Sequence, residues 1–109
     1  MNKINKVAII VVAVGIFTTS AFAASPETKS LYKAKCAACH GVDGNASVIG
    51  KKLGARDFSM PEVMKQTDTE LTDIVCKGKN KMPAYKEKLK EAEIKDLVGY
   101  LRELSKKKQ

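Results

Sequence analysis

The sequence predicts an all-α fold of three to five short helices. Apolar side chains recur with helical spacing over residues 91–104, which is the most regular pattern in the chain. Two further segments, beginning near residues 25 and 67, open with residues that commonly cap helix N-termini. No stretch alternates between apolar and polar residues as a half-buried strand does, and no internal repeat is present.

Residues 1–23 have the layout of a secretory signal peptide. Two lysines precede an apolar run over residues 7–17, and Ala21-Phe22-Ala23 resembles an A-x-A cleavage site. A membrane anchor is the alternative, but about 11 apolar residues fall well short of the roughly 20 needed to span a bilayer. We therefore expect cleavage after Ala23, which leaves a single mature domain of residues 24–109. The mature protein is expected in the periplasm, with no stable membrane insertion after cleavage.

The first helix of the mature domain is expected to run from Pro26 to about Ala38. Ser25 can cap its N-terminus, Pro26 suits the first helical position, and Glu27 complements the helix dipole in the first turn. Tyr32 lies on the stripe that should face the core. This helix therefore leads directly into a cysteine-containing run.

The run Cys36-Ala37-Ala38-Cys39-His40 has the spacing of a c-type haem attachment site. Its two thiols can add across the vinyl groups of a haem, while the adjacent imidazole binds the iron. A thioredoxin-like redox pair and half of a zinc site are the alternatives. A zinc site needs two more ligands, and the chain offers only Cys76 and no second histidine. A thioredoxin-like pair should follow a strand, and none is predicted, so we interpret the run as a haem site.

Residues 41–58 are expected to be irregular, with turn-forming residues at both ends. A loop of this length is unusual unless it wraps something, and one edge of a haem is a sufficient reason. The alternative is a mobile surface loop. Four apolar residues of the segment are expected to contact the haem: Val48, Ile49, Leu53 and Phe58.

Two shorter helices and a loop are expected next. One begins near Pro61 and turns Val63 and Met64 inward, whereas the other begins with a capping box over residues 67–70 and ends at Gly78. A loop then leads to the last helix, whose apolar stripe is Ile94, Leu97, Val98, Leu101 and Leu104. Cys76 lies off the apolar face of its helix, so we expect it to be partly exposed and not a haem anchor.

The second axial ligand of the iron is expected to be Met82. His40 is the only histidine, which excludes bis-histidine ligation within one chain and leaves a methionine, a lysine amine or an open position. Met64 lies among apolar residues of an expected helix, where a methionine usually packs in the core, and Met60 immediately precedes the start of that helix. Met82 lies in a loop that is stiffened by Pro83, far enough from His40 for the chain to reach the opposite haem face.

These motifs together resemble a class I cytochrome c of the small bacterial soluble kind, akin to cytochrome c-553. The resemblance rests on C-x-x-C-H after a helix, the loop Lys-Met-Pro-Ala-Tyr and the final helix, and it spans essentially the whole mature chain. It implies a class I cytochrome c fold around one covalent haem c, with thioethers at Cys36 and Cys39 and axial ligands at His40 and Met82. It also implies that the first helix crosses the last, bringing Tyr32 to Leu97 and Tyr100.

The chain departs from that family pattern at two places. Thr28 stands where the family commonly has a glycine at the helix crossing, so the crossing is expected to be wider or shifted toward Gly99. The proline whose carbonyl often accepts the histidine ring N–H is missing between Gly41 and Met60. We therefore expect a carbonyl near residues 52–53 to orient the ring.

Composition and motifs together predict a periplasmic one-electron carrier, a monomer and not an enzyme, that cycles its haem iron between Fe(II) and Fe(III). The formal net charge is +8, or about +6 without the two leader lysines, and an exported chain with few aromatics argues against nucleic acid. Redox partners with an acidic docking surface are therefore expected. The lysines around the Met82 loop that could bind such a surface are Lys77, Lys79, Lys81, Lys86, Lys88 and Lys90. The alternatives are a haem subunit of a larger oxidoreductase and an open-site haem peroxidase or gas sensor.

Overall fold

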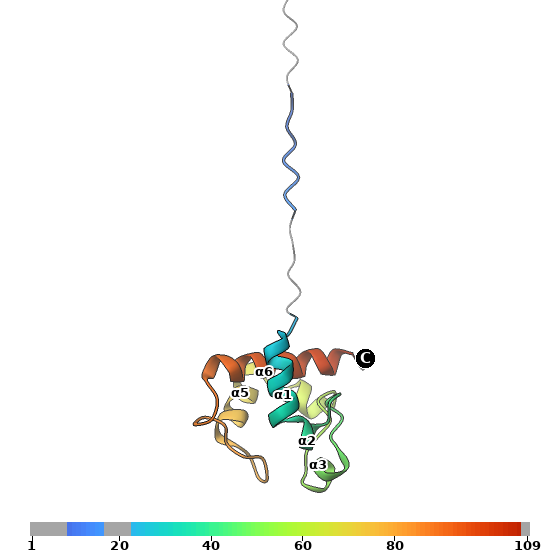
Figure 1. Cartoon of the computed structure of the whole chain (residues 1–109). Helices are drawn as coiled ribbons and strands as arrows, with labels where there is room; N and C mark the ends of the chain where they lie inside the picture. Colours follow the sequence, from blue (N-terminus) through green and yellow to red (C-terminus); the bar gives the residue numbers. More distant parts are fainter. Residues whose placement is uncertain (1–8, 17–22, 108–109) are drawn as a thin grey trace, which may run out of the picture.

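The computed structural model describes residues 9–16 and 23–107, and its folded part is helical (Figure 1). The described residues form α1 (Pro26–Lys35), α2 (Ala37–His40), α3 (Val48–Lys52), α4 (Pro61–Met64), α5 (Asp68–Lys77) and α6 (Glu91–Lys106). The only β-type pairing among these residues is a single bridge between Lys79 and Met82. The all-α prediction is confirmed, with one helix more than expected.

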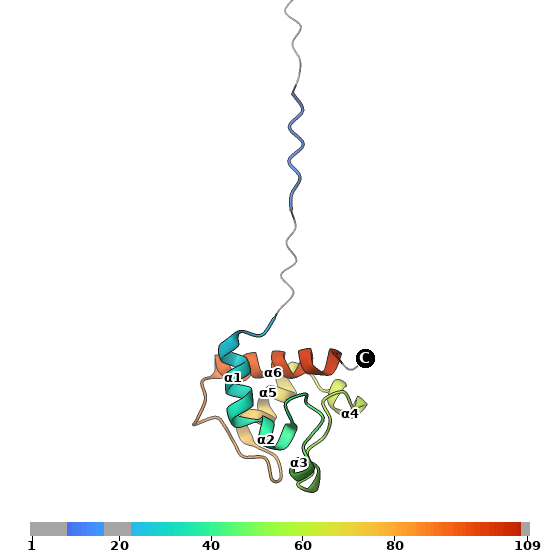
Figure 2. The same cartoon turned by 45° about the vertical axis from the view of Figure 1, so that its right-hand side comes forward.

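The predicted first helix divides in two at Cys36. Ser25 caps α1 as expected, because its hydroxyl oxygen accepts a hydrogen bond from the Thr28 N–H at 3.2 Å. At Cys36 the backbone leaves regular helical geometry (φ −118°), and α2 then runs for one turn to Gly41, where φ is +76°. The kink turns α2 away from the axis of α1 and toward the interior of the domain (Figure 2).

The segment 41–58 is not irregular throughout, because it contains α3. Ser47 caps this helix by accepting from the Gly50 N–H at 2.9 Å. A Cβ atom at Gly50 would lie 1.8 Å from the carbonyl oxygen of Cys39, so only glycine permits α3 to pack this closely on α2. Val48 and Ile49 are 74% and 64% exposed. Neither side chain lines the cavity of the domain, so the predicted role of these two residues as haem contacts is wrong.

The core forms where α1 crosses α6, and the stripe predicted for the last helix supplies much of it. All five predicted stripe residues are buried: Ile94, Leu97, Val98, Leu101 and Leu104. Tyr32 belongs to one core cluster with the last four of these residues and meets the Tyr100 ring edge-on, with ring centroids 5.1 Å apart. Thr28 is buried near the crossing, so this threonine is accommodated where the family commonly has glycine. The predicted packing of Tyr32 on Leu97 and Tyr100 is confirmed.

The helices α4 and α5 are joined to α6 through Arg102. The predicted capping box is present, since Thr67 and Glu70 each accept from the other's backbone N–H. Arg102 donates from Nε to the Asp68 carboxylate at 3.0 Å, and its other nitrogens donate to the carbonyls of Val63 and Gln66. One guanidinium therefore binds the end of α4, the connecting turn and the start of α5.

Replacing Arg102 by alanine is expected to lower the free energy of unfolding by about 1–3 kcal/mol, because two partly buried carbonyls and a carboxylate lose a charged donor. Denaturant unfolding of the purified protein measures the change. Lys95→Ala is the matched control: its exposed pair with Glu91 within α6 should contribute less than about 0.5 kcal/mol. Equal effects of the two substitutions would contradict the assignment.

The leader predicted for residues 1–23 lies mostly outside the described residues. Ala23 is exposed and Ala24 is buried, so the packed part of the structure begins at Ala24. Within residues 9–16 and 23–107, no helix is both long enough and apolar enough to cross a membrane.

Candidate functional site

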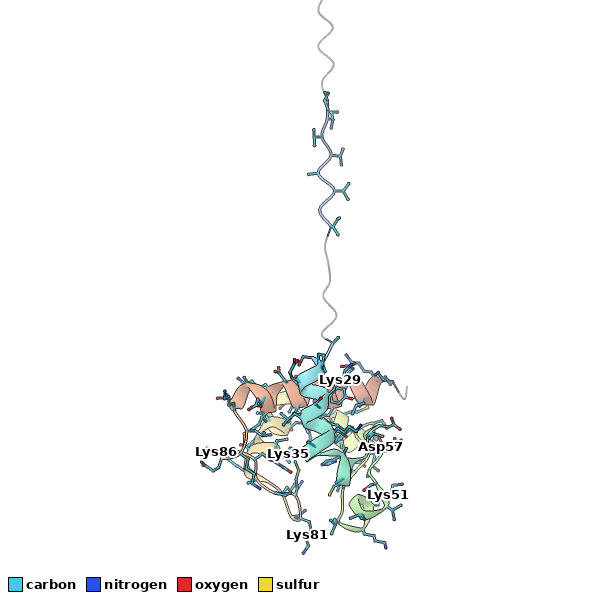
Figure 3. The ribbon with its side chains drawn as sticks, viewed as in Figure 1. Lys29, Lys35, Lys51, Asp57, Lys81 and Lys86 are labelled. Carbon is cyan, nitrogen blue, oxygen red and sulfur yellow. The ribbon has the colours of Figure 1, made fainter. Side chains whose placement is uncertain are left out.

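A cavity of about 290 Å³ lies between the two halves of the folded domain. One side is bordered by the end of α1, by α2 and by residues 53–58, and the other by α5, α6 and the loop 79–85. Apolar side chains form most of its wall: Leu53, Phe58, Val63, Leu71, Val75 and Leu97. In Figure 3, Lys81 and Lys51 mark the two tips, the Met82 loop and α3, at the end of the molecule away from α6.

The turn between α1 and α2 brings Cys36, Cys39 and His40 to this cavity. It is a tight turn, in which the Cys36 carbonyl accepts from the backbone N–H groups of Cys39 at 3.3 Å and His40 at 2.9 Å. Both thiols are free and half-buried. Burial raises the pKa of the Cys36 thiol to about 11, so this group is protonated at neutral pH.

The His40 ring is fixed by stacking rather than by a hydrogen bond. It lies parallel to the Phe58 ring within 28°, with ring centroids 4.9 Å apart. Its Nδ1 atom is buried and has no hydrogen-bond partner among the described residues, so the expectation of a carbonyl near residues 52–53 is wrong. Burial lowers the pKa of His40, which favours the neutral imidazole that binds metal ions. An unsatisfied buried nitrogen beside a cavity is a feature that a bound group could explain.

The loop that carries Met82 borders the same cavity from the other side. Met82 and Lys79 exchange two backbone hydrogen bonds, of 2.9 and 3.2 Å, which close a tight turn. Gly78 precedes this turn with φ +75°, and a Cβ atom there would meet the Met82 carbonyl oxygen at 2.6 Å. The other two methionines of segment 23–107, Met60 and Met64, are 41% and 39% exposed and do not line the cavity. The inward orientation predicted for Met64 is wrong.

Tyr85 is a residue whose role the sequence did not indicate. Its hydroxyl donates to the Lys35 carbonyl at 3.0 Å, and its backbone N–H donates to the Val75 carbonyl at 3.0 Å. The side chain therefore joins the Met82 loop to the end of α1, one residue before Cys36. The sequence shows an aromatic residue three positions after Met82. It does not indicate the hydrogen-bond partner of that residue, which lies 50 residues away in sequence.

The residues around the cavity fit a haem. An imidazole and a thioether border one apolar space, and the two thiols of the C-x-x-C pair lie at its edge. Histidine nitrogen and methionine sulfur are established iron ligands of c-type cytochromes, and apolar surroundings suit the macrocycle. In the described residues, no group of three or more histidine, cysteine, aspartate or glutamate side chains could hold a bare metal ion. Cys76 is half-buried, as expected, and does not line the cavity.

Comparisons with known proteins point to the same kind of site. Residues 23–101 match the family described as "Cytochrome C oxidase, cbb3-type, subunit III". A cytochrome c6 of Porphyra purpurea is 35% identical over 92 residues, which cover 84% of this chain and 82% of the relative. A cytochrome c6 of Synechococcus is 33% identical over 95 residues, covering 83% of this chain and 80% of the relative.

A longer relative and a solved structure complete the comparison. The cbb3-type cytochrome c oxidase subunit CcoP of Azospirillum brasilense is 30% identical over 106 residues, which cover 94% of this chain but 36% of that protein. The solved structure, titled "KustC0563 c-type cytochrome", superposes with a TM-score of 0.66 at 38% identity. It covers 71% of this chain and 95% of the other. The resemblance stated from the sequence is confirmed.

Proposed function

Because this chain belongs to the cytochrome c family, we propose that it is a periplasmic one-electron carrier whose haem iron cycles between Fe(II) and Fe(III). Membership of the family implies covalently bound haem c. One observation carries the proposal: the C-x-x-C-H turn and the Met82 loop border a single apolar cavity from opposite sides. This arrangement supports an iron with two protein ligands and no position open to substrate.

Four residues are assigned to the haem under this proposal. Cys36 and Cys39 would form the thioether bonds to the haem, and His40 and Met82 would bind its iron. The haem supplies the redox chemistry when bound, and the chain supplies the ligands and their surroundings. Phe58 holds the His40 ring by stacking, and the apolar wall keeps water from the interior. A neutral sulfur ligand and a low-dielectric wall both favour the less charged, reduced state.

The test of the proposal is spectroscopic and uses the exported wild-type protein. We expect a reversible one-electron titration, a near-infrared sulfur-to-ferric-iron absorption band and only slow binding of carbon monoxide by the ferrous protein, limited by opening of the Met82 loop. The two ligands would then occupy both axial positions through the cycle. A missing band together with rapid carbon monoxide binding would instead favour the open-site peroxidase or gas sensor.

Tyr85→Phe is expected to loosen the Met82 ligand without displacing it. The substitution removes the hydrogen bond that joins the Met82 loop to α1. A neutral hydrogen bond contributes about 0.5–1.5 kcal/mol, so the loop should open about 2- to 10-fold more often. The rate at which carbon monoxide binds the ferrous protein measures this opening.

Tyr32→Phe is the matched control for Tyr85→Phe. The Tyr32 hydroxyl also donates to a backbone carbonyl, that of Gly41 at 2.7 Å, but it does not contact the Met82 loop. We expect this variant to be less stable overall, with an unchanged rate of carbon monoxide binding. If the two variants bind carbon monoxide equally fast, Tyr85 does not hold the loop.

The loop that carries Met82 also supplies the proposed docking surface. Lys79 and Lys81 line the cavity, and the expected six lysines lie between residues 77 and 90, where Glu87 is the only acidic residue. A positive surface at the mouth of the cavity would attract an acidic redox partner, at a rate that falls as ionic strength rises. The acidic residues of α5 and α6 lie mainly in the first turns of those helices.

Lys81→Glu is expected to slow oxidation of the ferrous protein by anionic ferricyanide about 2- to 10-fold at low ionic strength. The effect should disappear in high salt, because mobile ions screen exposed charges. Lys95→Glu, the same charge change on α6, should leave the rate nearly unaltered, since Lys95 does not line the cavity. Equal slowing by both variants would indicate a net-charge effect and contradict docking at the loop.

A second candidate is a haem subunit or domain of a larger oxidoreductase. It is favoured by the match to a family described as an oxidase subunit and by the relative CcoP, of which this chain covers 36%. Purification of the chain from its natural membranes and soluble fraction separates the two candidates. Recovery with a stoichiometric membrane complex would support the subunit, and recovery alone in the soluble fraction would support the carrier.

A further inference from the structure

The start of the packed domain is tied to α6 by one polar contact. The backbone N–H of Ala24 donates to Oε2 of Glu103 at 3.2 Å, across 79 positions of sequence. Ala24 is 7% exposed, whereas Ala23 is exposed. The boundary between unpacked and packed chain therefore falls between these two alanines, at the end of the A-x-A-like site.

We propose that this contact becomes an ion pair when the leader is removed, with Glu103 as the binding site of the new N-terminus. A signal peptidase and one water molecule would hydrolyse the Ala23–Ala24 peptide bond. Ala23 would leave with a carboxylate, and Ala24 would keep the nitrogen as an α-ammonium group. The nitrogen that donates as an amide in the full chain would then carry a positive charge at the same place beside Glu103.

A carboxylate is needed at this position for an electrostatic reason. The new ammonium would lie two residues before Pro26, next to the positive end of the α1 dipole. Glu103 offsets that repulsion from a neighbouring helix, and its side chain is only 23% exposed, so solvent screens the pair less than on an open surface. Its other oxygen, Oε1, lies 3.8 Å from Lys107 Nζ. One carboxylate would therefore serve two cations.

The position of cleavage decides whether this pair can form. Cleavage one or more residues earlier would leave an ordinary amide at Ala24 and place the ammonium beyond the exposed Ala23. Cleavage one residue later would remove the buried Ala24 and its contact with α6. Only cleavage between Ala23 and Ala24 would therefore let the ion pair link the mature N-terminus to α6, beside the α1–α6 crossing.

The first test is the intact mass of the exported holoprotein, which should equal residues 24–109 plus one haem. The second compares Glu103→Gln in two mature forms: the authentic one, and one with Gly-Ser inserted between Ala23 and Ala24. The insertion moves the ammonium two residues away and leaves the Ala24 amide in place. In the authentic form Glu103→Gln should lower Tm by about 4–8 °C, and in the extended form by less than half as much.

Asp73→Asn on α5 is the control, since its carboxylate pairs with Lys77 within that helix and its loss should shift Tm equally in both forms. Equal losses for Glu103→Gln in the authentic and extended forms would overturn the ion pair, as would a mature mass that begins elsewhere. Neither measurement depends on the haem's ligands or potential. Failure here would therefore leave the proposed electron-transfer function standing.

Discussion

Replacing Cys36 and Cys39 together by serine is expected to abolish covalent haem and leave the polypeptide colourless and largely unfolded. Serine hydroxyls do not form the thioethers that we assign to the two thiols. The segment 24–109 has only 86 residues, and chains of this size bury too little apolar surface to be very stable without a cofactor or cross-link. Haem staining after denaturing electrophoresis and circular dichroism of the same sample measure both effects.

Cys76→Ser is the matched control for the double substitution. Cys76 is also half-buried, but it does not line the cavity. Its replacement should leave haem staining and helix content unchanged. Retention of covalent haem by the double variant would contradict the assignment of Cys36 and Cys39.

Met82→Ala is expected to open one axial position of the haem. The near-infrared band should disappear and the ferrous protein should bind carbon monoxide. Its reduction potential should fall, by a fraction of the roughly 0.8 V that different axial ligands span. The physical reason is that a soft, neutral thioether stabilises the ferrous state, and alanine leaves water or nothing in its place. Absorption spectra and a redox titration measure these changes.

Met64→Ala provides the comparison for Met82→Ala. Met64 lies on α4, is 39% exposed and does not line the cavity. We expect the near-infrared band and the reduction potential of the Met64→Ala variant to match those of the wild type. A band that persists in Met82→Ala and disappears in Met64→Ala would identify Met64 as the ligand and overturn the assignment of Met82.

The positions of α1, α5 and α6 along the chain could be predicted because each helix carries its own local signals. The apolar stripe of α6, the capping box at Thr67 and the cap at Ser25 each depend on residues within one or two turns. The break at Cys36 and the formation of α3 could not be predicted in this way. Both depend on how α2 and α3 pack together, and Gly50 contributes to that contact by having no side chain.

The cavity was predicted in part for a similar reason. The spacing of C-x-x-C-H and the loop around Met82 indicate which residues to bring together, and the structure places them on one cavity. The support of those residues involves partners that are distant in sequence. Phe58 stacks on His40 and Tyr85 binds the Lys35 carbonyl, and neither contact has a local sequence signature.

The close approach of Gly50 to the Cys39 carbonyl predicts that position 50 tolerates no other residue. Gly50 does not line the cavity, yet any other residue there would push α3 off the turn that bears His40. In a saturation library selected for pigmented colonies, position 50 should be as depleted as the cysteines themselves. Intolerance to substitution would then mark a steric contact without chemistry of its own, one helix away from His40.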